Sequence, residues 1–297
     1  MTVLRPSDSL VGRFLYQLNR RGAGLVPLGL AQALAIPPAD AVHALLPSKR
    51  RFAAQNFAHV TGLREDDPHV QRLVRACFRH FGRYMAEALH LQSWDSNTVL
   101  DRVTVEGEEN FAAAADHGRG IVFVSGHMGS TEVAAALAVL RGYRIRAVTE
   151  TLPAGWFMDW IVRTRQAMGI TLTSSEGAGL GLIRTLRRGG MVAMIIDAGI
   201  ERTGSIPVEF FGRPTLFPEG PARLARLTGA PLVFGLAVRR PGGLFKAYVC
   251  PPLLPDRDLP PAEDIARLTQ AVALTFEGFV RRYPAQWYAF RRIWPDA

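Results

Sequence analysis

His127 and Glu132 are the two residues of this sequence whose types and spacing best suit chemistry, with four residues between them. A neutral imidazole can accept a proton from a hydroxyl near neutral pH, and a carboxylate can orient the ring and stabilise the imidazolium. Such a pair needs no covalent intermediate when an acyl or other group moves from an activated thioester to a hydroxyl. The spacing therefore predicts His127 as a general base and Glu132 as its partner.

Spacing alone does not single out this pair, because the sequence holds a second His-x4-acid match at His90 and Asp95. With 7 histidines and 26 acidic residues among 297, about 0.6 such matches are expected by chance. His90 lies where a long amphipathic helix ends, and no buried strand precedes it, so this match indicates a pair at a helix end. His127 instead follows the apolar run 121–125, which is typical of a strand buried on both faces.

The residues after His127 predict a helix that begins with a capping hydroxyl. Ser130 and Thr131 directly precede an apolar helical run, and either side chain can accept a hydrogen bond from a backbone amide of the first turn. His127 would then lie at the C-terminal edge of a parallel sheet, where α/β proteins form their ligand crevices. A histidine that only satisfies the hydrogen bonds of a loop is the alternative interpretation.

Several other kinds of site are disfavoured by the sequence. It contains no Gly-x4-Gly-Lys-Ser/Thr loop and no Gly-x-Ser-x-Gly elbow, and 177–181 lacks the spacing of a dinucleotide fingerprint. No second histidine or cysteine stands at metal-ligand spacing near His127 and Glu132. We therefore expect neither a bound metal nor a resident cofactor, with the thioester donor acting as a co-substrate.

Four further side chains could complete a site. Arg163 and Arg165 offer guanidinium groups for phosphate, with a solvated helix face as the alternative. Asp197 ends the apolar run 191–196, at the usual place for a site residue of an α/β sheet, although a helix-capping role competes. Glu219 lies between Pro218 and Gly220 at a predicted helix start, where free amides could bind an anion.

Alternating strand and helix patterns after residue 101 predict an α/β fold with a central, mostly parallel sheet flanked by helices. Residues 1–297 are expected to form a single domain, in which 1–100 are helical and membrane-facing and 101–297 form the α/β catalytic core. The predicted strands are 121–125, 145–148, 170–172, 191–196 and 231–238. The predicted helices are 10–21, 25–36, 48–57, 69–91, 132–140, 155–168, 180–188, 219–227 and 264–282.

The charge of the chain favours an anionic partner. The net charge is +9, and almost all of it comes from arginine, because only Lys49 and Lys246 are lysines. The N-terminal helices carry apolar faces beside these arginines, which suits helices lying among anionic lipid headgroups; packing on their own core is the alternative. The arginines are spread through the chain without a nucleic-acid-binding motif, so a nucleic-acid partner is not expected.

The composition of the chain limits the class of protein it can be. With 48% hydrophobic and 21% charged residues, the chain can bury a large core. Its longest apolar stretch, 25–36, is too short to cross a bilayer, and no secretory signal is evident. Cys77 and Cys250 form no disulfide pattern, which fits a reducing, cytoplasmic setting. The aromatic and arginine-rich stretch 283–294 favours packing over an interfacial role.

Taken together, these motifs resemble the lysophospholipid acyltransferase superfamily, in its branch of bacterial lipid A biosynthesis (lauroyl and myristoyl) acyltransferases and phosphatidylinositol mannoside acyltransferases. The resemblance covers nearly the whole chain. It rests on 50–57, 105–107, the His127-x4-Glu132 block, 159–160 with Arg165, Asp197, 210–212 and 284–292.

The resemblance implies an acyltransferase on the cytoplasmic face of the membrane, bound peripherally. It would move a fatty acyl chain from acyl-CoA or acyl-carrier protein to a hydroxyl of a glycolipid. His127 is implied as base and Glu132 as its partner, while Arg165 and Asp197 match positions used near the acceptor or for site integrity. Glu201 and Glu209 are reserve acids that could also pair with His127.

Two departures from the family pattern leave the acceptor open. The spacer 128–131 lacks the asparagine or tryptophan often found there, and 217–220 is closer to the phosphate-binding motif of glycerolipid acyltransferases. A lysophospholipid or another glycerolipid acceptor is therefore an alternative to a glycolipid. The rival of a different class is a non-catalytic protein that binds membranes through its basic N-terminal helices.

Overall fold

The computed structural model describes residues 10–149, 156–174, 179–197 and 204–295, and its main feature is a seven-stranded sheet. All neighbouring strands run parallel except β8 and β9, which are antiparallel. The predicted α/β class and mostly parallel sheet are confirmed. In sheet order the strands are β1 (Val103–Glu106), β9 (Phe245–Val249), β8 (Leu232–Arg239), β2 (Ile121–Ser125), β5 (Met191–Ile195), β3 (Ile145–Thr149) and β4 (Thr171–Ser174).

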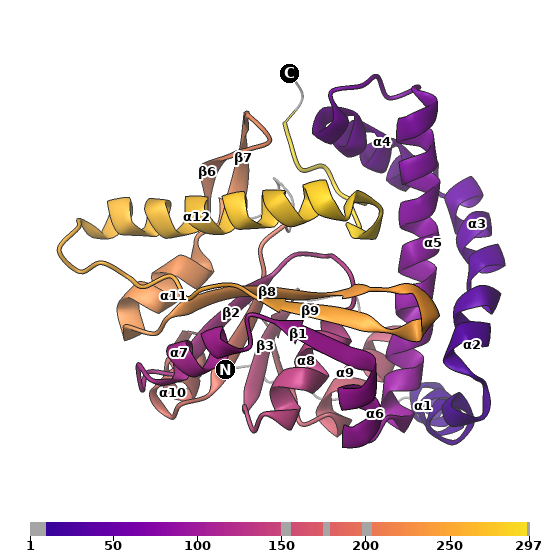
Figure 1. Ribbon diagram of the computed structural model, residues 1–297, viewed down its shortest axis with the longest axis horizontal. Helices are drawn as coiled ribbons and strands as arrows, with labels where there is room; N and C mark the ends of the chain where they lie inside the picture. The colour runs from indigo at the N-terminus through magenta and orange to yellow at the C-terminus, as the bar shows by residue number, and fades with distance from the viewer. Residues whose placement is uncertain (1–9, 150–155, 175–178, 198–203, 296–297) are drawn as a thin grey trace.

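Helices cover both faces of this sheet, which explains why its central strands are apolar on both sides. In Figure 1, α12 crosses above β8 and β9, and α7 and α8 lie below. Residues of α10, α11 and α12 share one core with β2 and β8, and residues of α7, α8 and α9 share another on the opposite face. These helices are α7 (Glu109–Ala115), α8 (Thr131–Leu140), α9 (Trp156–Ala167), α10 (Gly179–Arg187), α11 (Gly220–Thr228) and α12 (Pro261–Arg282).

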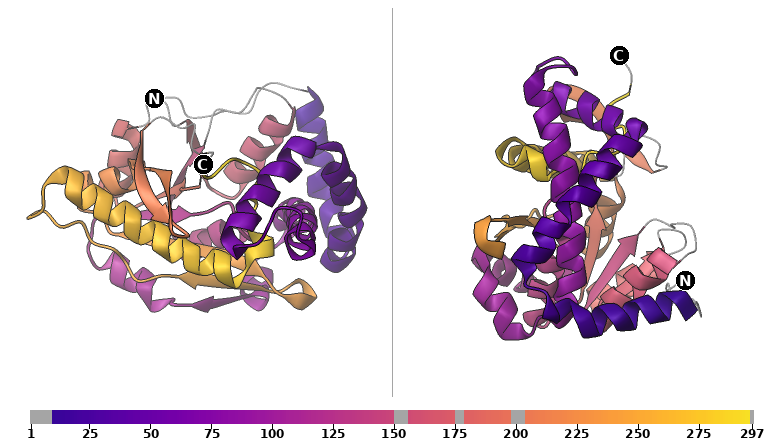
Figure 2. Two further views of the ribbon diagram at one scale, coloured as in Figure 1. Left: turned by 90° about the horizontal axis from the view of Figure 1, so that it is seen from above. Right: turned by 90° about the vertical axis from the view of Figure 1, so that its right-hand side faces the viewer.

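The N-terminal helices gather at one end of the sheet. Figures 1 and 2 show α5 standing along this end with α2, α3 and α4 beside it. In the right-hand view of Figure 2, α1 runs along the bottom, and it contacts α9. Their bounds are α1 (Leu10–Gly22), α2 (Leu28–Leu34), α3 (Ile36–Leu45), α4 (Pro47–Thr61), α5 (Pro68–His90) and α6 (Ser96–Arg102).

The single helix predicted over 25–36 is wrong. A short 3-10 turn ends at Leu25, and α2 begins at Leu28 after Pro27. A second helix, α3, begins at Ile36 with proline in its first turn. Proline has no backbone N–H to donate, so it is tolerated in the first turn of a helix and not in its interior. Pro27 and Pro37 therefore start two helices where the apolar pattern suggested one.

The segment 205–218 forms an antiparallel hairpin that the sequence analysis did not predict. Its strands are β6 (Ser205–Phe210) and β7 (Arg213–Pro218), joined through Phe211 and Gly212. Both turn residues have positive φ, 51° for Phe211 and 72° for Gly212. Tight hairpin turns of this kind favour Asn-Gly or Asp-Gly, and a phenylalanine at positive φ is uncommon, so the turn carried no recognisable signal.

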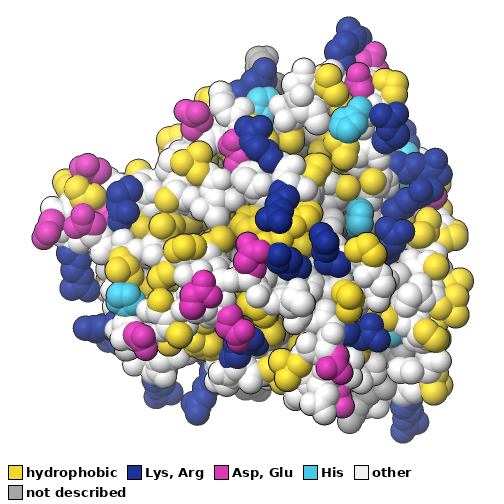
Figure 3. Space-filling view, viewed as in Figure 1, with side chains coloured by type: hydrophobic (Ala, Val, Ile, Leu, Met, Phe, Trp, Pro, Cys, Tyr) yellow, Lys and Arg dark blue, Asp and Glu magenta, His cyan; other side chains and the backbone are white. Residues whose placement is uncertain are grey.

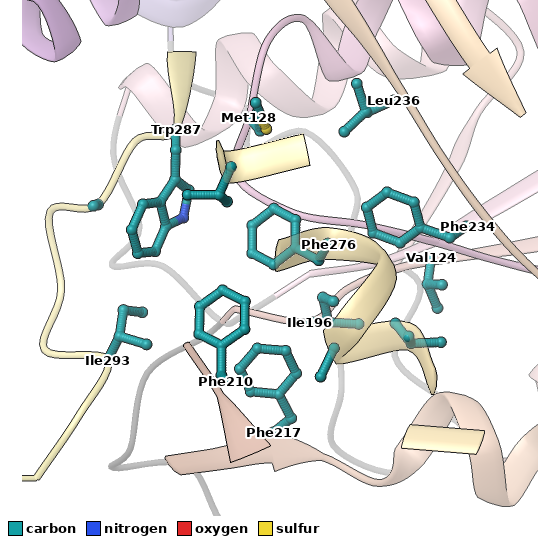
Figure 4. Packing of buried hydrophobic residues seen from close by; sticks show 14 of the residues in the cluster. Val124, Met128, Ile196, Phe210, Phe217, Phe234, Leu236, Phe276, Trp287 and Ile293 are labelled. Atoms are coloured by element: carbon teal, nitrogen blue, oxygen red, sulfur yellow. The ribbon is translucent and has the colours of Figure 1, made fainter. Parts of the chain in front are cut away.

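The hairpin, α12 and the C-terminal segment enclose an aromatic core beside the sheet. Figure 4 shows Phe276 of α12 among Phe210, Phe217 and Trp287, with Phe234 of β8 nearby. The rings of Phe210 and Phe276 stack 5.7 Å apart, and those of Phe210 and Trp287 meet edge-on at 6.2 Å. This core directly supports the loop that follows β2.

Candidate active site

The loop after β2 holds His127 and is fixed by two glycines. A Cβ at Gly126 would lie 2.3 Å from the Phe276 ring, and one at Gly129 would lie 2.0 Å from the carbonyl oxygen of Ala237. Gly129 also has a φ of +65°, which favours glycine. The next amide, of Ser130, donates to the same carbonyl oxygen at 2.7 Å. The loop can therefore lie close to both α12 and β8 only because these positions lack side chains.

The C-terminal segment holds the same loop from the other side. The amide of Gly129 donates to the carbonyl of Gln286 at 2.9 Å, and the amide of Tyr288 donates to the carbonyl of His127 at 2.7 Å. The hydroxyl of Tyr288 donates to the carbonyl of Gly129 at 2.5 Å. Trp287, between these contacts, is fully buried. The packing interpretation of this aromatic segment is confirmed at Trp287.

Asp197 is the carboxylate that binds the imidazole of His127. Its Oδ1 lies 3.0 Å from Nδ1 of His127 and accepts the backbone N–H of the same residue at 2.8 Å. Its Oδ2 accepts the indole N–H of Trp287 at 3.0 Å. Burial raises the pKa of Asp197, but the charge of His127 and these hydrogen bonds outweigh it and leave the pKa below its ordinary value.

This pairing determines which ring nitrogen carries the proton. An ionised carboxylate only accepts hydrogen bonds, so Nδ1 of His127 must be the donor. In the neutral ring Nε2 then carries the lone pair, which makes it the basic nitrogen. The side chain of His127 is 42% exposed and lines a pocket, whereas the side chain of Asp197 is almost fully buried.

The pairing differs from the expected His127–Glu132 pair, because Glu132 has other partners. Its Oε1 accepts a hydrogen bond from Arg165 at 2.8 Å, and its Oε2 accepts one from Thr131 at 2.7 Å. The hydroxyl of Tyr84 lies 3.2 Å from that of Thr131. A glutamate in the first turn of α8 points along the helix surface toward α9, whereas Asp197 leaves β5 directly beside the end of β2.

Glu132 remains a charged group in spite of its burial. Burial raises the pKa of Glu132, but the charge of Arg165 and hydrogen bonds from Tyr84, Arg165 and Thr131 together leave the pKa lowered. A buried carboxylate is stable in its ionised form when a cation and several donors surround it. The Glu132–Arg165 pair thus joins α8 to α9 along one wall of the pocket.

We expect the Arg165→Met variant to lose about 2 kcal/mol of unfolding free energy, because it leaves the buried carboxylate of Glu132 without its cation. The double variant Glu132→Gln with Arg165→Met should recover part of this loss, since no buried charge then remains unpaired. Urea unfolding of the single and double variants measures the difference. Additive losses in the double variant would contradict the pairing.

The pocket beside His127 has a volume of about 640 Å³. His127, Thr131, Glu132 and Arg165 lie on its polar part, and apolar side chains of the sheet and helices form most of the remaining lining. The apolar lining includes Phe123, Ala134, Ala135, Ala138, Ile145, Ala147, Ile161, Ile170, Met191 and Ala193. Deep apolar walls with a few convergent polar groups are typical of a site for a mostly apolar ligand.

The other predicted site residues are spread over different places. Glu219 lines the pocket just before α11 and pairs with Arg223 at 2.6 Å. Arg163 pairs with Asp159, at 2.9 Å, on α9. Glu209 is exposed on β6, and its backbone is bound to Gln270 of α12. Glu201 lies outside the described residues.

Two local predictions have clear outcomes. Ser130 occupies the position before α8, but its side chain makes no capping hydrogen bond, and the hydroxyl of Thr131 donates to Glu132, so the predicted hydroxyl cap is wrong. The predicted position of His90 at a helix end is confirmed, because His90 is the last residue of α5. The predicted pair with Asp95 is not observed: the ring nitrogens of His90 face the carbonyls of Ala86 and Val26, and Asp95 caps α6 by accepting the amide of Thr98. Context, rather than spacing, separates the two His-x4-acid matches.

Trp287 is a residue of the site that no sequence pattern indicates. Trp287 lies 90 residues after Asp197 in the chain, and only the fold brings its indole N–H to that carboxylate. A tryptophan in an aromatic cluster usually signals packing, and its single donor gives no further pattern to detect.

Within the described ranges, no group of three or more histidine, cysteine, aspartate or glutamate side chains is arranged to hold a metal ion. Nor does any helix in that part of the chain have both the length and the apolar character needed to span a bilayer. Cys77 and Cys250 are both free thiols.

Fold and site together define an α/β enzyme with a histidine–carboxylate pair at the rim of a deep, largely apolar pocket. The chain belongs to the family of bacterial lipid A biosynthesis acyltransferases, whose family model matches residues 9–295. It is also similar to two phosphatidylinositol mannoside acyltransferases. The one from Mycolicibacterium smegmatis is 28% identical over 81% of this chain and 78% of its own length. The one from Mycobacterium tuberculosis (strain CDC 1551 / Oshkosh) is 29% identical over 81% of this chain and 75% of its own length.

Proposed function

We propose that this acyltransferase moves a fatty acyl chain from an acyl thioester, acyl-CoA or acyl-carrier protein, to a hydroxyl of a membrane glycolipid. The observation that carries the proposal is the His127–Asp197 pair at the rim of the apolar pocket. The similarity to phosphatidylinositol mannoside acyltransferases and the lipid A family supports a glycolipid acceptor of one of these two types.

In the proposed reaction, Nε2 of His127 accepts the proton of the acceptor hydroxyl as its oxygen attacks the thioester carbonyl. A new C–O bond forms, and the tetrahedral intermediate then breaks the C–S bond. The departing sulfur takes the proton back from the imidazolium, so the enzyme ends as it began and no acyl-enzyme forms. Asp197 acts through His127, holding the Nδ1–H tautomer and stabilising the transient imidazolium.

Glu132 and Arg165 are proposed to position the pocket wall and the acceptor. Their ion pair joins α8 to α9 beside His127, and Arg165 can also donate to a polar headgroup at the pocket rim. The long apolar part of the pocket suits the fatty chain of the donor, because burying a chain there removes apolar surface from water. Glu201 stays a candidate from the family resemblance alone.

Peripheral binding to an anionic membrane, on its cytoplasmic face, completes the proposal. Leu10, Phe14 and Leu18 recur every four residues on α1 and are exposed. This spacing places them on one side of the helix, which suits a helix lying in the headgroup region. Further exposed leucines on the following helices, Leu25, Leu30, Leu34 and Leu45, extend the apolar surface.

The decisive experiment incubates the purified protein with a long-chain acyl-CoA and a phosphatidylinositol mannoside in mixed micelles. We expect acylated lipid and free thiol to form in equal amounts, measured by mass spectrometry and a thiol assay. The Glu263→Gln variant, which changes an exposed acid on α12, serves as a control and should match the wild type. Thioester hydrolysis without an acylated lipid would reject the proposal, and liposome binding without any turnover would favour a non-catalytic membrane-binding protein.

A lysophospholipid acceptor is the second candidate, favoured by the position of Glu219. Residues 217–220 resemble a glycerolipid phosphate motif, and Glu219, Gly220 and Arg223 all line the pocket at the start of α11. The same assay distinguishes the two acceptors by their kcat/KM values. A higher value for a lysophospholipid would replace the glycolipid in the proposal.

A further inference from the structure

A second cavity, of about 530 Å³, lies between α2, α3 and α5, and its lining residues are all different from those of the catalytic pocket. Its walls include Leu34, Val42, Phe78, Phe81 and Met85. The close approach of α3 to α5 depends on Gly82, where a Cβ would lie 2.8 Å from that of Ala39. This groove is separate from the site of the proposed reaction.

The chemistry of the groove suits a hydrocarbon. Among the described residues that line it, His90 is the only one with a polar side chain, and both ring nitrogens of His90 already face carbonyl oxygens, of Ala86 at 3.0 Å and Val26 at 2.7 Å. The remaining walls are almost entirely helical, so most of their backbone polar groups are bonded within the helices. A bound peptide would leave its own amides without partners there, whereas an alkyl chain needs none.

The opening of the groove is apolar as well. Val26, Leu34, Val42 and Leu89 line the groove and are also exposed to the outside. Leu25, Leu30 and Leu45 of the same N-terminal region are exposed as well. Exposed apolar side chains that gather in this number usually meet a membrane or a partner. An acyl chain could enter the groove from the proposed membrane side without crossing water.

Positive charge lies beside one wall of the groove. Asp40 follows Ala39 of that wall and accepts two hydrogen bonds from each of Arg75 and Arg79, at 2.7 to 3.1 Å. The hydrogen bonds of Arg79 and Arg75 hold the pKa of Asp40 well below its ordinary value, so the three groups carry one net positive charge. Figure 3 shows basic side chains gathered along the side of the molecule where α5 runs. This charge complements the phosphate of an anionic lipid.

Aromatic rings of α5 connect the wall of the groove to the catalytic pocket. Phe81 lines the groove, and its ring centre lies 5.8 Å from that of Tyr84, which lines the pocket. Tyr84 in turn packs on Tyr288 at 5.5 Å, next to the loop that holds His127. A lipid anchored in the groove would therefore have its headgroup within reach of the catalytic side of α5.

We propose that this groove binds one acyl chain of the lipid acceptor, while the catalytic pocket holds the chain of the donor. The inference rests on the proposed function and extends it, because it makes an acyl chain already present on the acceptor part of what the enzyme recognises. The headgroup of a lipid held in this way stays near His127 while its other chain remains in the membrane.

Kinetics with two acceptors test this role. The Met85→Trp variant fills the groove, and Leu34→Gln places a polar group at its opening. In both variants, kcat/KM for a two-chain glycolipid should fall about tenfold relative to kcat/KM for its deacylated, water-soluble headgroup. This change in the ratio is equivalent to about 1.4 kcal/mol of binding free energy. Leu274→Gln on α12 is the matched control, since Leu274 is 56% exposed and Leu34 is 61% exposed. An unchanged ratio in Met85→Trp would overturn the proposal that the groove binds an acyl chain of the acceptor.

A direct binding test does not depend on turnover. The two-chain glycolipid with a diazirine in one acyl chain is irradiated with the His127→Ala variant, and the crosslinked residues are identified by mass spectrometry. We expect crosslinks on α2, α3 and α5 that excess glycolipid suppresses and excess phosphatidylcholine does not. Crosslinks elsewhere, or equal suppression by phosphatidylcholine, would overturn the groove as an acceptor site. Groove crosslinks in a protein whose wild type transfers no acyl group would instead reject the proposed reaction and leave the groove as a lipid site.

Discussion

The His127→Ala variant should lose acyl transfer by about 10³-fold in kcat, because general-base catalysis by a positioned side chain contributes 10²- to 10⁴-fold. The acceptor KM should change little, since the imidazole acts on the hydroxyl proton in the transition state. Alanine keeps the backbone N–H and C=O that bind Asp197 and Tyr288, so the fold should survive. Single-turnover transfer measured beside a thermal unfolding curve separates the two effects.

A matched control and a rescue sharpen this result. His117→Ala removes an exposed histidine from the loop before β2 and should leave kcat unchanged. Because the side chain of His127 is 42% exposed, free imidazole at high concentration should enter the space left by alanine and restore part of the rate. A His127→Ala variant within tenfold of the wild type would show that another group is the base.

The Asp197→Asn variant should lower kcat by about 10³-fold with a folded protein, because an amide has only one acceptor oxygen for three donors. Either the indole of Trp287 or an N–H of His127 then faces an NH₂ group, and the Nδ1–H tautomer is no longer enforced. The acidic limb of the pH profile of kcat should also move to lower pH, since the imidazolium loses its carboxylate. A purely structural role for Asp197 would not move that limb.

Asp197→Asn should also change how the free energy of unfolding depends on pH. The pKa of Asp197 is lowered in the folded protein, so its carboxylate stabilises the fold above the ordinary aspartate pKa of 3.8 and loses this effect as the pH falls below it. The gap of about 2 kcal/mol between wild type and Asp197→Asn at pH 7 should therefore narrow below about pH 4. Urea unfolding at the two pH values measures it.

Glu132→Gln is the comparison that decides between the two acids. If Glu132 oriented the imidazole, as its spacing predicts, Glu132→Gln would reproduce the kinetic loss and Asp197→Asn would not. The hydrogen bond from Nδ1 to Asp197 predicts the reverse order of effects on kcat. Glu132→Gln should mainly weaken the contact between α8 and α9.

The sequence predicts those parts of the fold whose signals are local. The apolar run 121–125 matches β2 at both ends, and the apolar helical pattern after it predicts α8 to within one residue. The spacing of apolar residues and the local composition both depend on a few consecutive residues. Burial of a strand on two faces can therefore be inferred without knowing which strands lie beside it. The position of His127 at the C-terminal edge of the sheet follows from these two elements alone.

The partners of His127 depend on contacts between distant parts of the chain. Asp197 lies 70 residues from His127, and its place beside the ring follows from the pairing of β2 with β5. No spacing rule encodes that pairing, because the order of strands in a sheet depends on how helices pack over it. The preference for Glu132 came from proximity in sequence, and the ion pair with Arg165 occupies that carboxylate in the folded protein.

The hydrogen bonds between the His127 loop and residues 286–288 determine when the active site can form during synthesis of the chain. The loop lies between β2 and α8 near the middle of the chain, yet it is held by a segment that the ribosome makes more than 150 residues later. A nascent chain that has not yet reached Tyr288 has its histidine without this support. Acyl transfer should therefore begin only after residues 286–288 have been made, so that shorter nascent chains do not consume thioester.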